Sequence, residues 1–129
     1  MSHSFTIYPD DALIIVILEN KISIDELDEI GIAVTAHSDY KHTFNGVYDF
    51  RNAIKTFSPQ DIKMKFFHSK NKWSNKHGRW CSLNSTPRET ALSELYRLDI
   101  QNYYPFNLFS GIKAVSDYLH TDVSKYLSD

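Results

Sequence analysis

Seven consecutive apolar residues, Ala12-Leu13-Ile14-Ile15-Val16-Ile17-Leu18, decide the fold of this chain. The run has the length of a strand, and its Ile and Val side chains favour a pleated conformation. A strand with one face in water would alternate apolar and polar residues, whereas this run is apolar without a break. The pattern therefore predicts a strand that is buried on both faces, in a sheet that lies between layers of helices.

The residues on either side predict a hairpin and then a helix. Ser4 to Tyr8 is rich in aromatic and β-branched residues, and Pro9-Asp10-Asp11 separates it from a strand over Ala12 to Glu19, as in an antiparallel hairpin. Ser23-Ile24-Asp25-Glu26 has the spacing of a capping box. In that motif the Ser23 hydroxyl bonds the Glu26 amide while the Glu26 carboxylate reaches back to the cap amide. A helix is therefore predicted to begin there and to end near His37.

Strand and helix patterns then alternate three more times. The predicted strands are Gly46 to Phe50, Arg79 to Leu83 and Phe106 to Phe109, and helices are predicted to start at the caps Ser58, Thr86 and Ser110. Gly78 is predicted to end the helix that starts at Ser58. The result is an α/β fold of order β-β-α-β-α-β-α-β-α, with a mostly parallel five-stranded sheet, an antiparallel edge from the hairpin, and helices packed against the sheet. A chain of 129 residues with 42% hydrophobic content is expected to form one domain over residues 1–129.

This order of elements, with three stretches of sequence, resembles the SpoIIAA-like group of small bacterial proteins, which are single-domain relatives of STAS domains. The stretches are Val47-Tyr48-Asp49-Phe50-Arg51, the capped helix start at Ser58, and Phe109-Ser110-Gly111-Ile112-Lys113-Ala114-Val115-Ser116-Asp117-Tyr118-Leu119. The resemblance covers nearly the whole chain and implies a SpoIIAA-like STAS sandwich.

The resemblance also implies a binding role. STAS domains of the anti-sigma-factor-antagonist type bind a partner kinase and are switched by phosphorylation of a serine at the start of the helix after the third strand. Ser58 occupies that place, although Thr56-Phe57-Ser58-Pro59 stands where the family has Asp-Ser-Ser-Gly. Ser58 is therefore a candidate phosphorylation or anion site, and a plain helix N-cap is the alternative. The group is also similar in topology to CRAL-TRIO lipid-carrying domains, which implies ligand or membrane association as a competing role.

The segment that follows Ser58 is locally basic. Six of the 14 Lys and Arg residues lie within it, without an acidic residue between them: Lys63, Lys65, Lys70, Lys72, Lys76 and Arg79. If residues 59–77 are helical, lysines flank an apolar face that includes Ile62 and Trp73. Such a helix can lie on an anionic membrane, or it can pack its apolar face on the sheet and leave a solvated basic rim. We take these six residues and Trp73 as candidate lipid or membrane contacts.

Composition and motifs argue against several other roles. The net charge of -2 gives no global attraction to nucleic acid, so no nucleic-acid partner is expected. Cys81 is the only cysteine, no apolar run approaches the roughly 20 residues of a membrane span, and the N-terminus lacks a signal-peptide pattern, so we expect a cytoplasmic protein. His37, Asp39 and His42 are too few to specify a metal site, and we expect no metal or cofactor. No nucleophile elbow, phosphate loop or paired-carboxylate signature is present, so we expect no enzyme activity.

The sequence is therefore interpreted as a non-catalytic binding or regulatory module that contacts a protein partner through its helices and the edge near Ser58. The alternative is a binder of lipid or a small apolar ligand that associates peripherally with membranes through the basic helix 59–77. The oligomeric state stays open, with a homodimer as one option.

Overall fold

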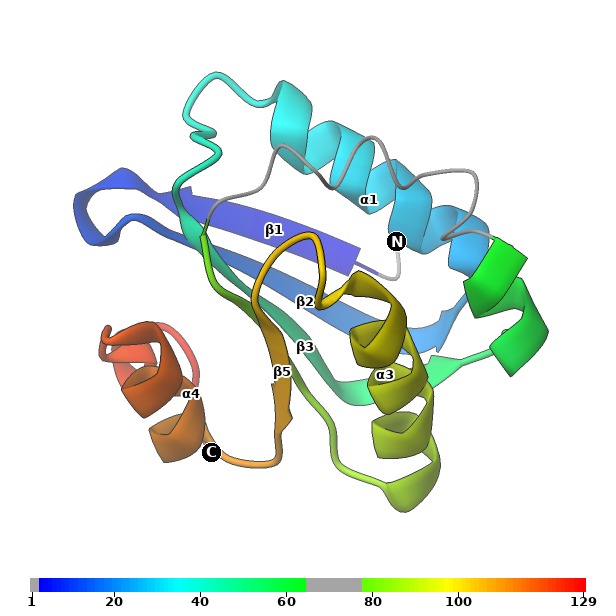
Figure 1. Ribbon diagram of the computed structural model, residues 1–129. Helices are drawn as coiled ribbons and strands as arrows, with labels where there is room; N and C mark the ends of the chain where they lie inside the picture. The colour runs from blue at the N-terminus through cyan, green and yellow to red at the C-terminus, as the bar shows by residue number, and fades with distance from the viewer. Residues whose placement is uncertain (1–2, 65–77) are drawn as a thin grey trace.

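The computed structural model describes residues 3–64 and 78–129, and in these ranges the chain forms one five-stranded mixed sheet (Figure 1). The strands are β1 (His3–Tyr8), β2 (Leu13–Ile22), β3 (Asn45–Lys55), β4 (Trp80–Leu83) and β5 (Phe106–Phe109), and they lie side by side in chain order. β1 runs antiparallel to β2, and every later neighbour is parallel. The predicted fold class is confirmed, including its antiparallel edge.

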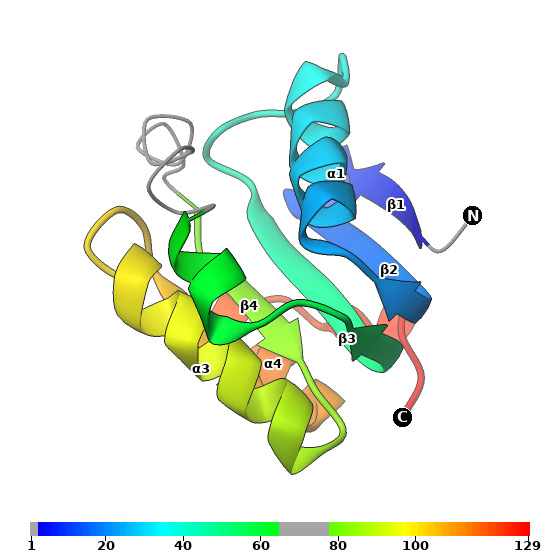
Figure 2. The same cartoon turned by 90° about the vertical axis from the view of Figure 1, so that its right-hand side faces the viewer.

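Helices cover both faces of the sheet. α1 (Ile24–Ala36) and α3 (Pro87–Ile100) lie on one face, and α4 (Ile112–Leu119) lies on the other (Figure 1). Residues 59–64 form a further helical segment, drawn in green next to α3 in Figure 2. Short 3-10 turns at Pro9–Asp11 and Val123–Lys125 complete the described elements.

The apolar strand β2 divides its side chains between two cores, as its unbroken pattern predicts. Ile14, Val16 and Leu18 pack in the core beneath α1 and α3, whereas Leu13 and Ile15 pack in the core beneath α4. Each fully buried side chain of this size contributes roughly 1.5–3 kcal/mol through the removal of apolar surface from water. The two cores therefore hold the helical layers on opposite sides of one sheet.

The central strands are longer than their apolar patterns predict. β2 continues to Ile22 and β3 continues to Lys55, where these two residues pair. Glu19, Asn20 and Lys21 are exposed, so this part of β2 carries polar residues that hide it from a search for apolar runs. A register shift between Ile17 and Glu19 accompanies the change of surroundings.

Two predicted helix caps differ in detail from the structure. The Ser23 hydroxyl accepts the Glu26 N–H at 3.1 Å as predicted, but Glu26 Oε2 lies 2.9 Å from His3 Nδ1 on β1 instead of reaching back to the cap. The predicted cap Ser110 is wrong, because α4 begins one residue later with Gly111 at the N-cap and no side-chain cap bond. In the first case a tertiary contact with β1 replaces part of a local pattern.

Among the helices in the described ranges, none combines the length and the apolar character that a membrane crossing requires.

Candidate functional site

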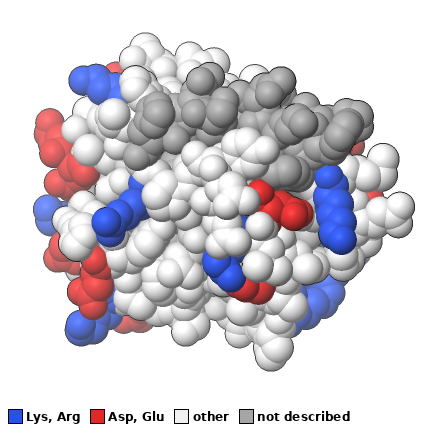
Figure 3. Space-filling model, in the orientation of Figure 1, with Lys and Arg blue, Asp and Glu red and all other residues white. Residues whose placement is uncertain are grey.

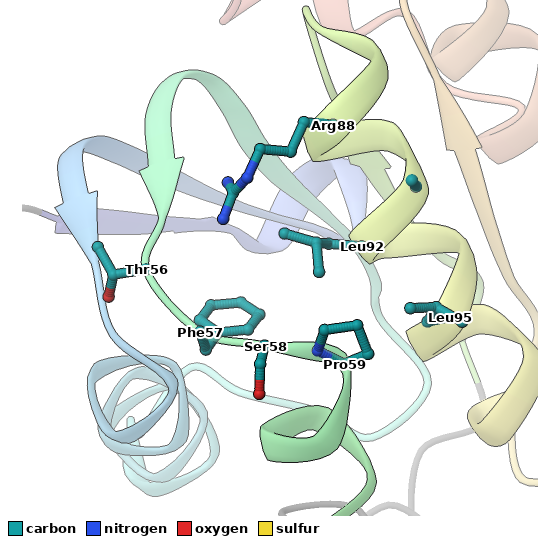
Figure 4. A pocket seen from close by; sticks show the side chains of 8 residues that line it. Thr56, Phe57, Ser58, Pro59, Arg88, Leu92 and Leu95 are labelled. Atoms are coloured by element: carbon teal, nitrogen blue, oxygen red, sulfur yellow. The ribbon is translucent and has the colours of Figure 1, made fainter.

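A groove of about 510 Å³ opens where β3 ends, between residues 56–59 and α3 (Figure 4). The carboxyl ends of parallel strands are the usual ligand side of an α/β sheet. Buried Phe57 and Leu92 contribute apolar surface to it. The groove is lined by Thr56, Phe57, Ser58, Pro59, Arg88, Ala91, Leu92 and Leu95. Its surface is mainly apolar, with polar groups near its rim, so the groove suits an apolar group better than a highly polar one.

Ser58 borders this groove as the N-cap of helical residues 59–64. Its hydroxyl accepts the Asp61 N–H at 3.2 Å, and its own N–H donates to Asp61 Oδ2 at 2.8 Å. This reciprocal pair is a capping box in which Asp takes the usual place of Glu. Figure 4 shows the Ser58 hydroxyl turned away from α3. The N-cap role is therefore present, and phosphorylation of Ser58 stays a prediction.

Arg88 supplies the cationic side chain of the groove. Pro87 opens α3, and the Thr86 hydroxyl accepts the Glu89 N–H at 3.3 Å, so a regular cap fixes the turn that carries Arg88. The Arg88 side chain is 57% exposed, and its Nη1 lies 2.9 Å from Glu89 Oε1. Figure 4 shows it reaching from α3 toward the end of β3. The guanidinium is thus anchored at one nitrogen and open to solvent elsewhere.

A buried polar network lies behind the groove and joins β3 to α3. Lys55, the last residue of β3, is only 2% exposed. Its Nζ donates to Asn84 Oδ1 at 2.9 Å and to Glu89 Oε2 and the Glu89 carbonyl oxygen at 3.1 Å each. The Asn84 side chain also accepts from the Ser93 hydroxyl and donates to Ser82 Oγ. All three ammonium hydrogens therefore have acceptors, which a buried charge requires.

The charge balance of this network favours a positive rim. Burial lowers the pKa of Lys55 from 10.5 to about 8; the Glu89 carboxylate opposes the shift, and Arg88 adds to it. Lys55 thus stays mostly protonated at neutral pH. Because Lys55 and Arg88 share the single carboxylate of Glu89, one positive charge is left over, and Arg88 presents it to solvent.

The structure separates the two described members of the predicted basic surface. Lys63 is exposed on helical residues 59–64, whose Ile62 packs with Phe57 and Leu92. Arg79 lies at the other face of the sheet, where its Nη1 donates to the Tyr118 carbonyl at 2.8 Å and lies 3.1 Å from His120 Nε2. The other candidate contacts, Lys65, Lys70, Lys72, Trp73 and Lys76, lie outside the described residues. The lipid interpretation therefore stays a prediction.

Charges on the face seen in Figure 3 are mixed, with Lys and Arg interspersed among Asp and Glu in the described residues. Within the same ranges, no group of three or more His, Cys, Asp or Glu side chains could hold a metal ion. His37 instead uses Nδ1 to accept the Asp39 N–H at 3.0 Å within its own loop.

Sequence reasoning missed the network of Lys55, Asn84 and Glu89, and it missed Arg88. Glu89 stands three residues after the cap Thr86, which is the place of Glu in a capping box. Lys55 comes after the predicted strand Gly46 to Phe50, where a lysine is ordinarily a surface residue. Their contact joins residues 34 positions apart, so no local spacing signals it. A polar residue on the inner side of α3 was the available clue, because Glu89 and Ser93 share the helix face of buried Leu92.

One solved structure places this architecture among known folds. The chain is similar to an uncharacterised protein of the DUF3478 family from Shewanella loihica PV-4, with a TM-score of 0.59 and 11% sequence identity over 91% of this chain and 94% of that chain. That protein has a SpoIIAA-like fold. This chain shares that fold. No protein-family model matches the sequence, and no curated protein matches it.

The similarity concerns the fold and does not extend to the residues of the groove. At 11% identity the two chains share the arrangement of strands and helices, and no catalytic family is indicated. The SpoIIAA-like resemblance of the sequence is thereby supported at the level of architecture.

Proposed function

We propose that the protein is a non-catalytic binding module that engages a protein partner through the groove between residues 56–59 and α3. The observation that carries the proposal is an open, mainly apolar groove with one exposed cation at the carboxyl ends of the parallel strands. Thr56, Ser58, Pro59, Arg88 and Ala91 are all exposed, so the groove is accessible from solvent.

The ionisable groups around the groove support a non-catalytic role. Glu89 and Lys55 are buried and bonded to each other, and the Ser58 hydroxyl accepts the bond that caps its helix. Among the described lining residues, none is a His, Cys, Asp or Glu that could act as a general base on a bound group. The fold neighbour, likewise, indicates no catalytic family.

Site-specific photocrosslinking in the native cells tests the proposal. A photoreactive amino acid at Ala91 in the groove is expected to trap a discrete protein adduct. The matched control carries the same amino acid at Lys113 on α4, whose side chain is 91% exposed on the other face of the sheet. Equal trapping at both positions, or no protein adduct at Ala91, would contradict the proposed role of the groove.

Phosphorylation of Ser58 is a separate proposal for how such binding would be controlled. Ser58 is exposed and stands at a helix N-terminus, where a phosphate is electrostatically favoured. The nearby Asp61 carboxylate, which accepts the Ser58 N–H, opposes it. Mass spectrometry of protein from native cells is expected to find phosphate on Ser58 in a fraction of the molecules. Its absence under all growth conditions would remove the switch.

The N-cap role of Ser58 predicts a stability effect that is independent of phosphorylation. Ser58→Ala removes the acceptor of the Asp61 N–H and is expected to lower the free energy of unfolding by about 1 kcal/mol. Ser58→Asp keeps a capping oxygen and is expected to cost less, as measured by urea denaturation. Equal losses in both variants would show that the cap bond is not the relevant interaction.

A further inference from the structure

The outward face of α3 continues the groove as a row of apolar side chains. Ala91, Leu95 and Leu98 are spaced by four and three residues, so they lie on one side of the helix. Leu98 is 49% exposed, Ala91 is exposed, and Leu95 is half-buried beside the groove. A continuous row of apolar side chains that includes Leu95 and Leu98 is more informative than isolated ones, because contiguous apolar patches mark contact surfaces.

Charged side chains stand at the two ends of this row. Arg88 lies one turn before Ala91, and Asp99 follows Leu98 at the far end. Arg88 and Lys55 share one carboxylate, so within the described residues the Arg88 end carries a positive charge that this carboxylate does not neutralise. Eleven residues of α-helix separate the two charges, which corresponds to about 16 Å, or three turns.

We propose that this surface binds an amphipathic helix of a partner protein, with apolar anchors at i, i+4 and i+7 and a carboxylate that pairs with Arg88. The proposal rests on the proposed function and specifies the partner for the same groove. Residues 56–59 and α3 form the two walls, and Phe57 and Leu92 receive the apolar anchors between them (Figure 4). The carboxylate then meets the exposed side of the guanidinium in a second, charge-assisted bond.

The form of the surface favours a helix over an acyl chain. A small ligand is typically enclosed over about 70–90% of its surface. Here five of the eight lining residues are exposed, and the apolar row runs out of the groove along α3. A straight row of this length matches the side of a second helix. The opposite charges at its two ends determine the orientation in which that helix binds.

Selection from a displayed library of helical peptides tests this specificity. Anchor positions and the flanking positions are randomised, and binders are selected on the whole protein, on Arg88→Glu, and on the control Lys113→Glu. The wild type and the control are expected to enrich apolar residues at i, i+4 and i+7 with Asp or Glu at the flank facing Arg88. On Arg88→Glu that flank is expected to change to Lys or Arg, and a peptide selected on the wild type is expected to bind about tenfold more weakly.

Amide chemical shifts locate the selected peptide and separate the outcomes. Shifts at Phe57, Leu92 and Leu95 support the proposal, whereas shifts confined to other surfaces overturn it. The proposal is also overturned if helical peptides are enriched no more than a scrambled library, or if the residues selected at the flank are the same on the wild type and on Arg88→Glu. Vesicles of phosphatidylglycerol that shift the same amides, when no helix is enriched, would assign the groove to lipid.

The two proposals fail in distinguishable ways. A protein adduct at Ala91 without enrichment of helical peptides would leave the binding module standing and remove the helical partner. Failure of both the adduct and the selection would remove both proposals.

Discussion

Lys55 shows how a single residue can lock two elements together. Its ammonium lies 4.0 Å from the centroid of the Phe50 ring and bonds the first turn of α3, while its main-chain N–H donates to the Glu89 carboxylate at 3.2 Å. A buried ion pair contributes little net stability, but removal of one partner leaves the other uncompensated. At the residue scale, the pair therefore acts mainly by fixing where α3 starts relative to β3.

Mutation of Lys55 alone is expected to lower the free energy of unfolding far more than mutation of both Lys55 and Glu89. Lys55→Met should lower the free energy of unfolding by about 3–5 kcal/mol, because Glu89 stays buried with Arg88 as its only remaining charge partner in the described residues. Lys55→Met combined with Glu89→Gln should recover most of this loss, since a Gln oxygen still accepts the main-chain N–H of residue 55. Urea denaturation measures both. A single variant as stable as the double one would contradict this account.

The titration of Lys55 predicts a pH dependence of stability. Folding lowers the pKa of Lys55 from 10.5 to about 8 through burial, so between these values the unfolded chain holds more protons than the folded one. The contribution of Lys55 to the free energy of unfolding should therefore rise with pH in this window, by at most about 1.4 kcal/mol per pH unit.

The Lys55 contribution should be sought between about pH 8 and pH 9.5, below the range in which tyrosines ionise, as a difference in slope between the wild type and a variant that lacks Lys55 and keeps Cys81. Burial also raises the pKa values of Cys81, Tyr48, Tyr96 and Tyr104. Ionisation of the Cys81 thiol in the unfolded chain therefore lowers stability above about pH 8.5, and ionisation of the tyrosines lowers it above about pH 10. Chemical denaturation at several pH values, with the Lys55→Met, Glu89→Gln double variant as control, isolates the lysine. A slope equal in both proteins would show that Lys55 is not its source.

At the element scale, two glycines are needed for close approach. A Cβ on Gly46 in β3 would lie 2.2 Å from the Trp80 ring, and a Cβ on Gly78 would lie 2.0 Å from the Phe44 carbonyl oxygen. The sequence pattern assigned Gly78 to the end of a helix; the structure shows that Gly78 is buried against main chain that cannot easily move. Gly31, in the interior of α1, has open space where a Cβ would lie, because no other part of the described chain beyond its own helix comes within 4 Å.

Alanine substitutions are therefore expected to change stability in opposite directions. Gly31→Ala should raise the free energy of unfolding by about 0.5–1 kcal/mol, because Ala has the higher helix propensity. Gly78→Ala should lower it by about 1–3 kcal/mol or more, because the backbone of Phe44 must shift. Thermal and urea unfolding compare the two variants with the wild type. A stabilising Gly78→Ala would contradict the packing described for this position.

The sheet edge at β5 carries its own protection. Trp80 N–H donates to the Pro105 carbonyl, and Asn84 N–H donates to the Phe109 carbonyl, so Leu108 N–H points away from β4. The Asn107 side chain accepts that N–H at 2.9 Å. A short edge strand with a satisfied outward donor is a poor template for pairing with another chain, which favours α3 over β5 as the contact surface.

At the scale of the whole molecule, the C-terminal segment closes the core beneath α4. Val123 and Leu127 are buried there, Tyr126 stacks on Tyr8 at a centroid distance of 3.7 Å, and the Ser128 carbonyl accepts from Arg51 at 2.7 Å. Residues at the two ends of the described chain thus meet across one face of the sheet. The last residues therefore belong to the folded unit, although their composition is that of a short polar tail.

The buried position of Leu127 predicts its contribution to stability. Leu127→Ala should lower the free energy of unfolding by about 2–4 kcal/mol, because it leaves a cavity in a core that joins β2 to α4. The control Leu98→Ala removes a half-exposed side chain from α3 and should stay within about 0.5 kcal/mol. Urea denaturation measures both. Equal effects would show that the C-terminal segment is not packed as described.

The sequence by itself determined that helices cover both faces of one sheet, that the sheet is mostly parallel with an antiparallel edge, and where most helices and strands begin and end. An unbroken apolar run such as Leu13 to Leu18 requires cover on both faces, and caps such as Ser23 and Thr86 mark helix starts, because both signals are local in the chain. The strand and the two helix starts that these signals predict are therefore present in the structure.

Only the tertiary structure decided the site. It extended β3 to Lys55, joined that lysine to Glu89, turned Arg88 into the groove, and sent Arg79 to the other face of the sheet. The bond from Lys55 to Glu89 spans 34 positions of the chain, and the bond from Arg79 to Tyr118 spans 39. Such pairs of polar residues are recognised only by their burial and hydrogen bonds in the folded chain. The periodicity of the sequence does not indicate them, because it does not depend on which polar residues meet in space.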